Sequence, residues 1–528
     1  MGALIPHQDT LMTRTLHTPS LESKHRQTRL TSPAAAPRNL FDLPIRLSPS
    51  FSGEWAQLHF GGAPLRDERR SRRLVQTAES LARNLGGNIP GACLKACEVR
   101  AMYRLFDTPK VKPDFLQAPH RRLTRKAMNR PGAATLLIED GSEMSWTNHE
   151  PIPGCGPIAA GKEHQQGFLL HTVLAVRWPH DFVPQVGQRR PPVEILGLAD
   201  QQFHVRPPQG SRPKPHGRYR NRARDKGWLE SHLWEQSTER LGKAPEGVRW
   251  VRIVDRGADI FESIESYRRR SHGFVVRAAL DRNLETPDGK GLAGGSLFAR
   301  ARQAKPLGFF ELPLRARPCH AARVARLAVS TCQARLRSPQ RPGRKAGTAP
   351  GLDVTVVRVW EPEPPEGEKA LEWILLHDRP VSSYEDAVEV VQQYALRWLI
   401  EEFHKGLKTG MGAEDLQLKT GQRLQTAAAI LSIVTLRLLD LRETARLYPD
   451  APADESGLME IERRVLAAYL ERELRTVSDV ALAIGRLGGH MNRKADGLPG
   501  WQTLQRGMIQ LRLLTQGVLL SEKIRKSG

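Results

Sequence analysis

Short apolar runs alternate with amphipathic stretches between residues 135 and 276, and this alternation restricts the fold more than any other feature of the chain. Three apolar runs come first, and each has the length and residue types of a β-strand. The expected elements, in order, are strands at Thr135–Asp140, His171–Trp178 and Glu194–Gly197, a helix over Lys226–Leu241, a strand at Val248–Asp255, a helix over Ala258–Arg270 and a strand at Phe274–Val276. Strands that alternate with helices predict an α/β domain.

Two of these predicted strands end in an aspartate, Asp140 in the first and Asp255 in the fourth. Three strands followed by helix–strand–helix–strand is the element order of the ribonuclease-H-like fold. In that fold the ends of the first and fourth strands carry active-site carboxylates, although an analogy of fold alone does not establish a function. The neighbouring acids Glu139 and Asp259 fit this arrangement less well.

A long helix is expected to begin at residues 382–383, where either serine has an acidic residue three positions later, the spacing of a capping box. Along this helix Tyr394, Arg397, Glu401 and Lys408 follow at offsets of 0, 3, 7 and 14. At about 3.6 residues per turn they project within about 60° of one another. One face would therefore carry a phenol, two cations and a carboxylate.

The other side of this helix carries Val388, Val391 and Leu399, which suit a buried core. Glu402 points about 100° away from Glu401, so it is the less apt of the two acids. Taken alone, the polar face is better interpreted as a solvated surface with an Arg–Glu pair one turn apart.

Three carboxylates from distant segments, Asp140, Asp255 and Glu401, have a specific use if they converge. Hard divalent cations such as Mg²⁺ prefer oxygen ligands. Two such ions about 3.5–4 Å apart can activate the attacking oxygen and stabilise the leaving oxygen in a displacement at phosphorus. Arg397 and Lys408 would then hold the phosphates of the cut strand.

A net charge of +23 and a pI near 10.2 indicate a polyanionic partner. A ribosomal or membrane-surface protein could be as basic, but here the basic residues are spread through folded-looking segments, which favours nucleic acid. One cluster lies at the start of a predicted helix: Arg66, Arg69, Arg70, Arg72 and Arg73. Positive charges there are repelled by the N-terminal end of the helix dipole, and a bound phosphate would reduce this repulsion. The alternative interpretation is that these arginines form a solvated face.

The 528 residues are too many for one ordinary core, so two to four domains are expected. No apolar run approaches the roughly 20 residues that span a bilayer, and no signal peptide is evident, so we expect a cytoplasmic protein with no membrane partner. Cys93 and Cys97 are expected to be buried thiols, because a structural zinc site usually needs about four ligands.

The helix motif also resembles a known family. Tyr394-x2-Arg397-x3-Glu401-x6-Lys408 is similar to the Tyr–Arg–Glu–Lys signature of DDE transposases in the insertion-sequence-four family. The stretches around it resemble the composite-transposon branch that cuts through DNA hairpins. The residues that carry this further resemblance are Ile138–Asp140, Asp255–Asp259, Trp373, Trp398, Ile400–Lys405, Lys408–Gly410 and Ala483–Gly489. Weaker similarity begins at Trp55, so the resemblance covers most of residues 55–520.

The resemblance implies a bacterial, nucleoid-associated cut-and-paste transposase, in which Asp140, Asp255 and Glu401 are catalytic and hold two Mg²⁺ per active site, with Mn²⁺ able to substitute. It implies that Tyr394, Arg397 and Lys408 contact DNA phosphates and that Trp373 receives a flipped base. Further candidate DNA-binding residues are Arg256, Arg277, His404 and Lys405. Arg256 and Arg277 could instead form internal ion pairs, and His404 suits a supporting position better than a ligand. A core tryptophan in the strand Leu371–Leu376 is the alternative for Trp373.

The resemblance also implies an order of events: a nick, attack of the freed 3′-hydroxyl on the opposite strand to form a hairpin, hairpin opening, and joining to target DNA. The partners would be double-stranded DNA, as transposon ends and target, and a second copy of the chain in a homodimeric synaptic complex.

These expectations combine into an α/β architecture: a ribonuclease-H-like catalytic core, interrupted by a mainly β insertion and flanked by helical domains. The predicted divisions are a mobile basic arm at 1–50, a helical end-DNA-binding domain at 51–122, the first part of the core at 123–285, a β-rich insertion at 286–380, the second part of the core with the catalytic helix at 381–425, and a helical dimerisation and synapsis domain at 426–528.

Some residues depart from the family pattern. Gly141-Ser142-Glu143 stands where the branch has hydroxyl residues, the arm before residue 50 is longer, and the basic loop at 338–351 is expanded. Two rival functions stay open: a non-catalytic DNA-binding regulator derived from a transposase, and another ribonuclease-H-like nuclease. A glycosidase built on a carboxylate pair does not suit a charge of +23.

Overall fold

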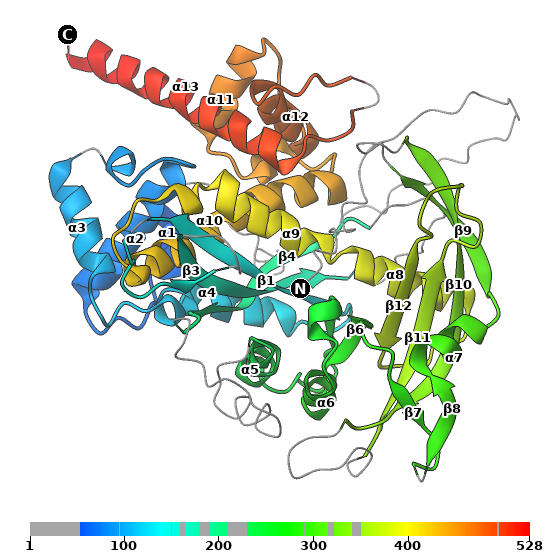
Figure 1. Ribbon diagram of the computed structural model, residues 1–528. Coiled ribbons are helices and arrows are strands. Elements are labelled where there is room, and N and C mark those ends of the chain that lie inside the picture. The colour runs from blue at the N-terminus through cyan, green and yellow to red at the C-terminus, as the bar shows by residue number, and fades with distance from the viewer. Residues whose placement is uncertain are drawn as a thin grey trace, which may run out of the picture.

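A mixed sheet of 12 strands runs through the molecule, with helices on both of its faces (Figure 1). The computed structural model describes residues 53–93, 95–148, 150–158, 164–178, 191–207, 230–289, 291–314, 321–339, 350–493 and 496–527. The predicted arm at 1–50 and most of the predicted loop at 338–351 lie outside these residues.

The first half of the sheet has the strand order β4-β3-β1-β5-β6. Its members are β1 (Thr135–Thr147), β3 (Gln165–Arg177), β4 (Glu194–His204), β5 (Trp250–Val254) and β6 (Gly273–Arg277), with the short β2 (Gly156–Pro157) at the edge of β3. β3 is antiparallel to both β1 and β4, whereas β1, β5 and β6 are parallel. The five strands predicted between residues 135 and 276 are therefore present, and they lie in one sheet.

The first strand does not end at Asp140, as the sequence had suggested, but continues to Thr147. The reason is its partner: β3 pairs with β1 along its whole length, from Thr135 to Thr147, whereas the parallel pairing with β5 stops at Glu139. Asp140 is therefore the first residue of β1 beyond the β5 ladder. Asp255, predicted as the last residue of its strand, directly follows β5.

The second half of the sheet is antiparallel and continues the first half without a break. β12 pairs with β6, and β11 and β10 follow. Its elements are β7 (Asn283–Glu285), β8 (Leu292–Ser296), α7 (Leu297–Gln303), β9 (Gly308–Leu314), β10 (Arg323–Leu336), β11 (Leu352–Trp360) and β12 (Glu372–His377). The β-rich region predicted as an insertion thus shares one hydrogen-bonded sheet with the preceding strands.

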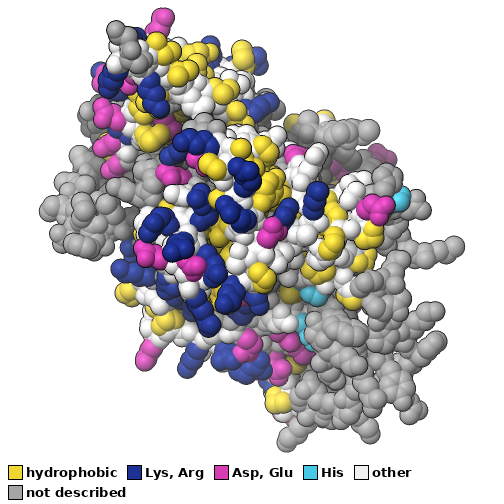
Figure 2. Space-filling view, turned by 90° about the vertical axis from the view of Figure 1, so that its left-hand side faces the viewer, with side chains coloured by type: hydrophobic (Ala, Val, Ile, Leu, Met, Phe, Trp, Pro, Cys, Tyr) yellow, Lys and Arg dark blue, Asp and Glu magenta, His cyan; other side chains and the backbone are white. Residues whose placement is uncertain are grey.

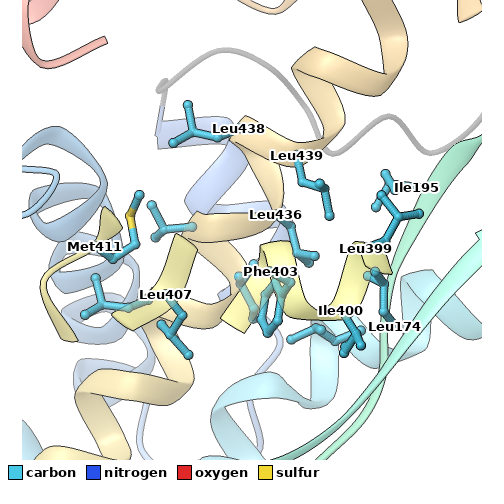
Figure 3. Close-up of a cluster of buried hydrophobic side chains, with 14 of the residues drawn as sticks. Leu174, Ile195, Leu399, Ile400, Phe403, Leu407, Met411, Leu436, Leu438 and Leu439 are labelled. Carbon is cyan, nitrogen blue, oxygen red and sulfur yellow. The ribbon is translucent and has the colours of Figure 1, made fainter. Parts of the chain in front are cut away.

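The two faces of the first half-sheet are covered by different helices (Figure 1). α5 (His232–Leu241) and α6 (Phe261–Arg269) lie on one side. On the other side, α9 (Trp398–Lys405) is held between the sheet and α10 (Gly421–Leu447). Figure 3 shows the contact, in which the α9 side chains Leu399, Ile400 and Phe403 meet apolar residues of β3, β4 and α10. This packing fixes which face of α9 is left for polar side chains.

Helices flank the sheet at both ends of the described chain. On the N-terminal side they are α1 (Gly53–Phe60), α2 (Glu68–Arg83), α3 (Ala96–Phe106) and α4 (Pro113–Met128). On the C-terminal side they are α11 (Glu460–Tyr469), α12 (Val477–Leu487) and α13 (Trp501–Ser527). α10 is the one described helix long and apolar enough to cross a membrane, but 89% of its most apolar window is buried inside the protein. It is therefore explained as a core helix.

Candidate active site

The sheet register brings Asp140 and Asp255 side by side. Glu139 of β1 pairs with Val254 of β5, so the next residue of each strand is one of the two aspartates. Neighbouring strands lie about 4.8 Å apart, and this sets the distance between the two backbones. Both carboxylates thus project from adjacent parallel strands at the point where β5 ends.

The environment of Asp140 raises the pKa of its carboxyl group to about 7. Burial is the main cause, and the neighbouring carboxylates of Asp255 and Glu401 act in the same direction. The guanidinium of Arg397 and the N–H of Gly141, which donates to Asp140 Oδ1 over 2.7 Å, oppose the shift. Burial and two neighbouring carboxylates therefore both favour the neutral form of Asp140.

Arg397 connects two of the three carboxylates. Its Nη1 lies 3.4 Å from Asp140 Oδ2, and its Nη2 donates to Glu401 Oε1. The side chain of Arg397 is only 7% exposed, compared with 21% for Asp140 and 29% for Glu401. The Arg–Glu pair expected one helical turn apart is therefore present, and Asp140 extends it to the sheet.

The single long helix predicted here is in fact three segments. α8 (Tyr384–Ala395) begins after Ser383, whose hydroxyl accepts from the Asp386 N–H as a capping serine should. A turn at residues 396–397 separates it from α9, and residues 406–410 form a π-helical turn. The projection angle calculated for Lys408 is therefore wrong, because Lys408 lies in the π-turn, which adds a residue to the helix period.

Tyr394 lies below the surface rather than on an open face. Its side chain is 3% exposed, and its ring meets the edge of Trp373 with centroids 5.1 Å apart. Trp373 is half-buried on β12, and the guanidinium of Arg277 on β6 lies 5.8 Å from its ring centroid. The three residues form one cluster where the two halves of the sheet join.

Lys408 has an acidic neighbour that the sequence did not single out. Its Nζ lies 3.9 Å from Glu414 Oε1, and the same oxygen accepts from the Ser145 N–H over 2.8 Å and from its hydroxyl over 3.3 Å. Glu414 therefore ties the segment after the π-turn to β1. No motif marked this glutamate, and only the pairing across 269 residues of sequence reveals it.

The other candidate DNA-contacting residues lie in different settings. Arg256 and Lys405 are exposed, the first in the turn after Asp255 and the second at the end of α9. His404 is 5% exposed, and burial, together with the charge of Lys408, lowers the pKa of its imidazole to about 3. His404 is therefore neutral and inside the protein, which suits a supporting position.

The three acids judged less apt all have structural partners. Glu139 is fully buried and accepts from Arg252 Nη1 over 2.6 Å. Asp259 accepts from the Ala279 N–H over 2.7 Å, and Glu402 accepts from Arg442 Nη1 over 2.9 Å. These bonds engage the three less apt carboxylates, whereas Asp140 and Glu401 contact Arg397 and Asp255 lies beside Asp140.

A divalent cation is compatible with this site by the chemistry of its donors. The side chains of Asp140, Asp255 and Glu401 offer carboxylate oxygens, and the charges of Asp255 and Glu401 add to burial in raising the pKa of Asp140. Within the described ranges no three acidic, histidine or cysteine side chains already stand as a preformed ligand set. Arg397 would have to leave one carboxylate before all three could share an ion.

The N-terminal helices present a basic surface. Figure 2 views the side of the molecule at the left of Figure 1, near α1–α3, and Lys and Arg side chains gather there. We call the exposed lysines and arginines of residues 61–122 the basic face; they are Arg66, Arg69, Arg72, Arg83, Lys95, Arg100, Arg104, Lys110, Lys112 and Arg122. The cluster predicted before α2 is thus part of a wider surface.

The cysteines near this surface correct one expectation. Cys97 is exposed and Cys93 is half-buried, so the two are not the buried thiols that were predicted. The described residues offer them no set of zinc ligands.

Comparison with known proteins gives two results. Residues 52–111 match the family model described as transposase DNA-binding, so the match spans α1–α3, which carry much of the basic face. Among solved structures, the cryo-EM structure of the piggyBac transposase synaptic complex with hairpin DNA aligns with 79% of this chain and 65% of that chain. The identity is 10% and the TM-score 0.31, which is too low to support an argument.

Proposed function

We propose that the chain is a DNA transposase of the DDE type, which cuts and joins DNA at Asp140, Asp255 and Glu401. The observation that carries this proposal is that Arg397 contacts Asp140 and bonds Glu401, and that Asp140 lies beside Asp255, in a chain whose residues 52–111 match a transposase DNA-binding family model. A basic helical surface and an acidic site in one molecule suit an enzyme that grips DNA with one part and cuts it with another.

The core belongs, in this proposal, to the ribonuclease-H-like fold. Support comes from the strand order β4-β3-β1-β5-β6, with β3 antiparallel to its neighbours and β1, β5 and β6 parallel. Asp140 and Asp255 then occupy adjacent central strands, and Glu401 reaches them from a helix packed on the same face.

Asp140, Asp255 and Glu401 would hold two Mg²⁺ ions, or Mn²⁺ in their place. When bound, such ions lower the pKa of a ligating water and neutralise charge that develops at phosphorus. Arg397 would then leave a carboxylate and bond a phosphate of the cut strand, because its planar guanidinium can form paired hydrogen bonds to either group. Lys408 is held near β1 by Glu414 and would contact the DNA phosphates as a second cation.

The Tyr–Arg–Glu–Lys motif places the chain, in this proposal, in the insertion-sequence-four family and its hairpin-forming branch. Water cuts one strand at the element's end, the freed 3′-hydroxyl attacks the other strand, a second water opens the hairpin, and the 3′-hydroxyl attacks target DNA. Each step exchanges one oxygen for another at phosphorus, so one site can serve all four. Trp373 supports the hairpin step, since a half-buried indole beside Tyr394 and Arg277 offers an extruded base a stacking partner.

A second copy of the chain is expected in the assembled complex, and α13 is its proposed contact. The first turns of α13 bury Trp501, Leu504 and Leu511 against the protein. Beyond them the helix reaches away from the body (Figure 1). Its exposed apolar side chains are Leu513, Leu514, Val518, Leu519, Leu520 and Ile524. Exposed apolar side chains on a projecting helix suit contact with the same helix of a second copy.

The decisive experiment uses supercoiled plasmid that carries the coding region with its flanking DNA. Wild-type protein should nick the plasmid in Mg²⁺ at inverted repeats in those flanks, and Glu401→Gln should bind the same DNA but cut at least about 1,000-fold more slowly. Glu385→Gln, on the exposed first turn of α8, is the matched control and should cut normally. Wild-type protein that binds the repeats yet never cuts them would instead indicate a DNA-binding regulator.

A further inference from the structure

A cavity of about 690 Å³ lies away from the carboxylates, where α4, β4 and α10 meet. Its wall includes Lys112 and Phe115 at the start of α4, Gln202 on β4, and Gln422 and Gln425 on the first turns of α10. Its size falls within the range of roughly 300–1,000 Å³ typical of small-molecule sites. None of the sequence motifs discussed above lies in it.

Ion pairs and hydrogen bonds tie the walls of this cavity to one another. Arg423 of α10 makes two bonds of 2.6 Å to Asp107, which follows α3. Arg240 of α5 bonds Asp200 on β4 over 2.9 Å and also bonds Asp114 on α4. Because each wall is anchored to the next, the hollow is a fixed part of the fold rather than a gap between loose helices.

The cavity lies along β4, the edge strand of this part of the sheet, two strands from β1. Across the strands, Asp140 pairs with Thr172, and Thr172 pairs with Gln201, which lines the cavity. Gln201 Nε2 donates to Thr172 Oγ1 over 3.1 Å, so the two side chains share a face. Two strand spacings of about 4.8 Å therefore separate the backbone of Asp140 from that of Gln201.

The free groups in the wall suit a nucleotide. Gln425 is half-buried, and its carboxamide makes no hydrogen bond within the described part of the chain. The amides of Gln202 and Gln422 donate to backbone carbonyls and leave their own oxygens available. A carboxamide matches the donor and acceptor on the edge of a base, and the ring of Phe115, 40% exposed, offers a stacking surface.

An exposed lysine and two helix N-termini in the same wall suit a phosphate, and the Asp114 carboxylate in that wall is paired with Arg240. Lys112 is exposed, and both α4 and α10 begin at the cavity, so their N-terminal ends face it. The cavity also adjoins residues 52–111, which match the DNA-binding family model, because Pro109 and Val111 line it.

We propose that this cavity binds a single nucleotide, with the base between Phe115 and Gln425 and the phosphate near Lys112. The inference rests on the proposed function, since the nucleotide expected there is one displaced from DNA on its way from the basic face to Asp140. A free nucleotide has the same chemistry, and the experiment separates the two sources.

The test compares the full chain with the double variant Phe115→Ala/Gln425→Ala by fluorescence anisotropy. The probes are a labelled paired duplex and the same duplex with one extra unpaired nucleotide. Wild-type protein should bind the bulged duplex about tenfold more tightly, and the double variant should bind both alike. Phe309→Ala, which removes an equally exposed ring (42%) on β9, should keep the preference.

A second arm titrates deoxyadenosine monophosphate into each protein by calorimetry. If wild-type protein prefers the bulged duplex and the double variant does not, the cavity binds a nucleotide within DNA. If wild-type protein binds deoxyadenosine monophosphate and the double variant does not, the cavity binds a free nucleotide. If neither signal exists, or if either persists in the double variant, the cavity inference is wrong. Failure of wild-type protein to bind even the paired duplex would overturn the proposed function as well.

Discussion

Arg397 Nη1 lies 3.4 Å from Asp140 Oδ2, so a cation from the turn between α8 and α9 already contacts the central strand of the sheet. The same guanidinium bonds Glu401. The carboxylates of Asp140 and Glu401 repel each other, and the guanidinium of Arg397 between them offsets that repulsion.

Replacing Arg397 with Ala should therefore destabilise the protein in the absence of metal, by about 1–3 kcal/mol, because two half-buried carboxylates lose their shared partner. Added Mg²⁺ should raise the melting temperature of Arg397→Ala more than that of wild type, because the ion supplies the missing charge. Thermal denaturation in EDTA and in Mg²⁺ measures both effects. Equal Mg²⁺ shifts in the two proteins would show that no ion shares these carboxylates.

The buried Glu139–Arg252 pair predicts how stability depends on pH. Despite complete burial, which by itself would raise it, the pKa of Glu139 is lowered by the charge of Arg252 and by bonds from His171 and Ser237. A lowered folded-state pKa contributes stability above the ordinary glutamate pKa, and this is lost as pH falls through the folded value. Denaturant unfolding from roughly pH 3 to 7 should show this loss.

Glu139→Gln should remove that acid-dependent stability and cost about 3–5 kcal/mol near neutral pH, because Arg252 would then be a buried charge without its counter-ion. Glu366→Gln, at an exposed loop position, is the control and should follow the wild-type curve. If Glu139→Gln is as stable as wild type at neutral pH, the pair is not a structural element of the core.

Replacing Trp373 with Ala should slow hairpin formation about tenfold more than the first nick, because the indole would stack on an extruded base only after that nick. Trp373→Phe keeps an aromatic face and should restore most of the rate. Single-turnover assays on labelled DNA ends separate the two steps on denaturing gels. Equal slowing of both steps by Trp373→Ala would assign the ring to packing against Tyr394 instead.

Charge on the projecting part of α13 should prevent assembly of the DNA complex without affecting the fold. Leu520→Glu/Ile524→Glu places two charges where the proposed partner helix packs, so the complex with end DNA should sediment as one protomer rather than two. Gln516→Glu adds charge at another exposed position of the same helix and serves as control. Paired protomers in the double variant would exclude this surface as the contact.

Local patterns in the sequence predicted the elements well. Ser383 caps α8, Asp255 follows β5, and Val388, Val391 and Leu399 are buried. Each of these depends on residues a few positions apart, where helix and strand periods are visible.

Features that depend on distant partners were missed. The extension of β1 past Asp140 follows from pairing with β3, and the role of Glu414 follows from its bond to Ser145. The π-turn at residues 406–410 also breaks the helical period from which the position of Lys408 was calculated. A window of sequence contains no information on such contacts, so the site's chemistry could be inferred but its detailed geometry could not.

The ladder between β6 and β12 has a mechanical consequence. Asp255 follows β5, β5 pairs with β6, and β6 pairs with β12, the strand that carries Trp373. The carboxylates proposed to cut DNA and the proposed base-stacking ring are thus attached to one continuous hydrogen-bonded sheet. Because this sheet would hold their separation fixed, the proposed mechanism requires that any bending that brings a base to the ring occur in the DNA.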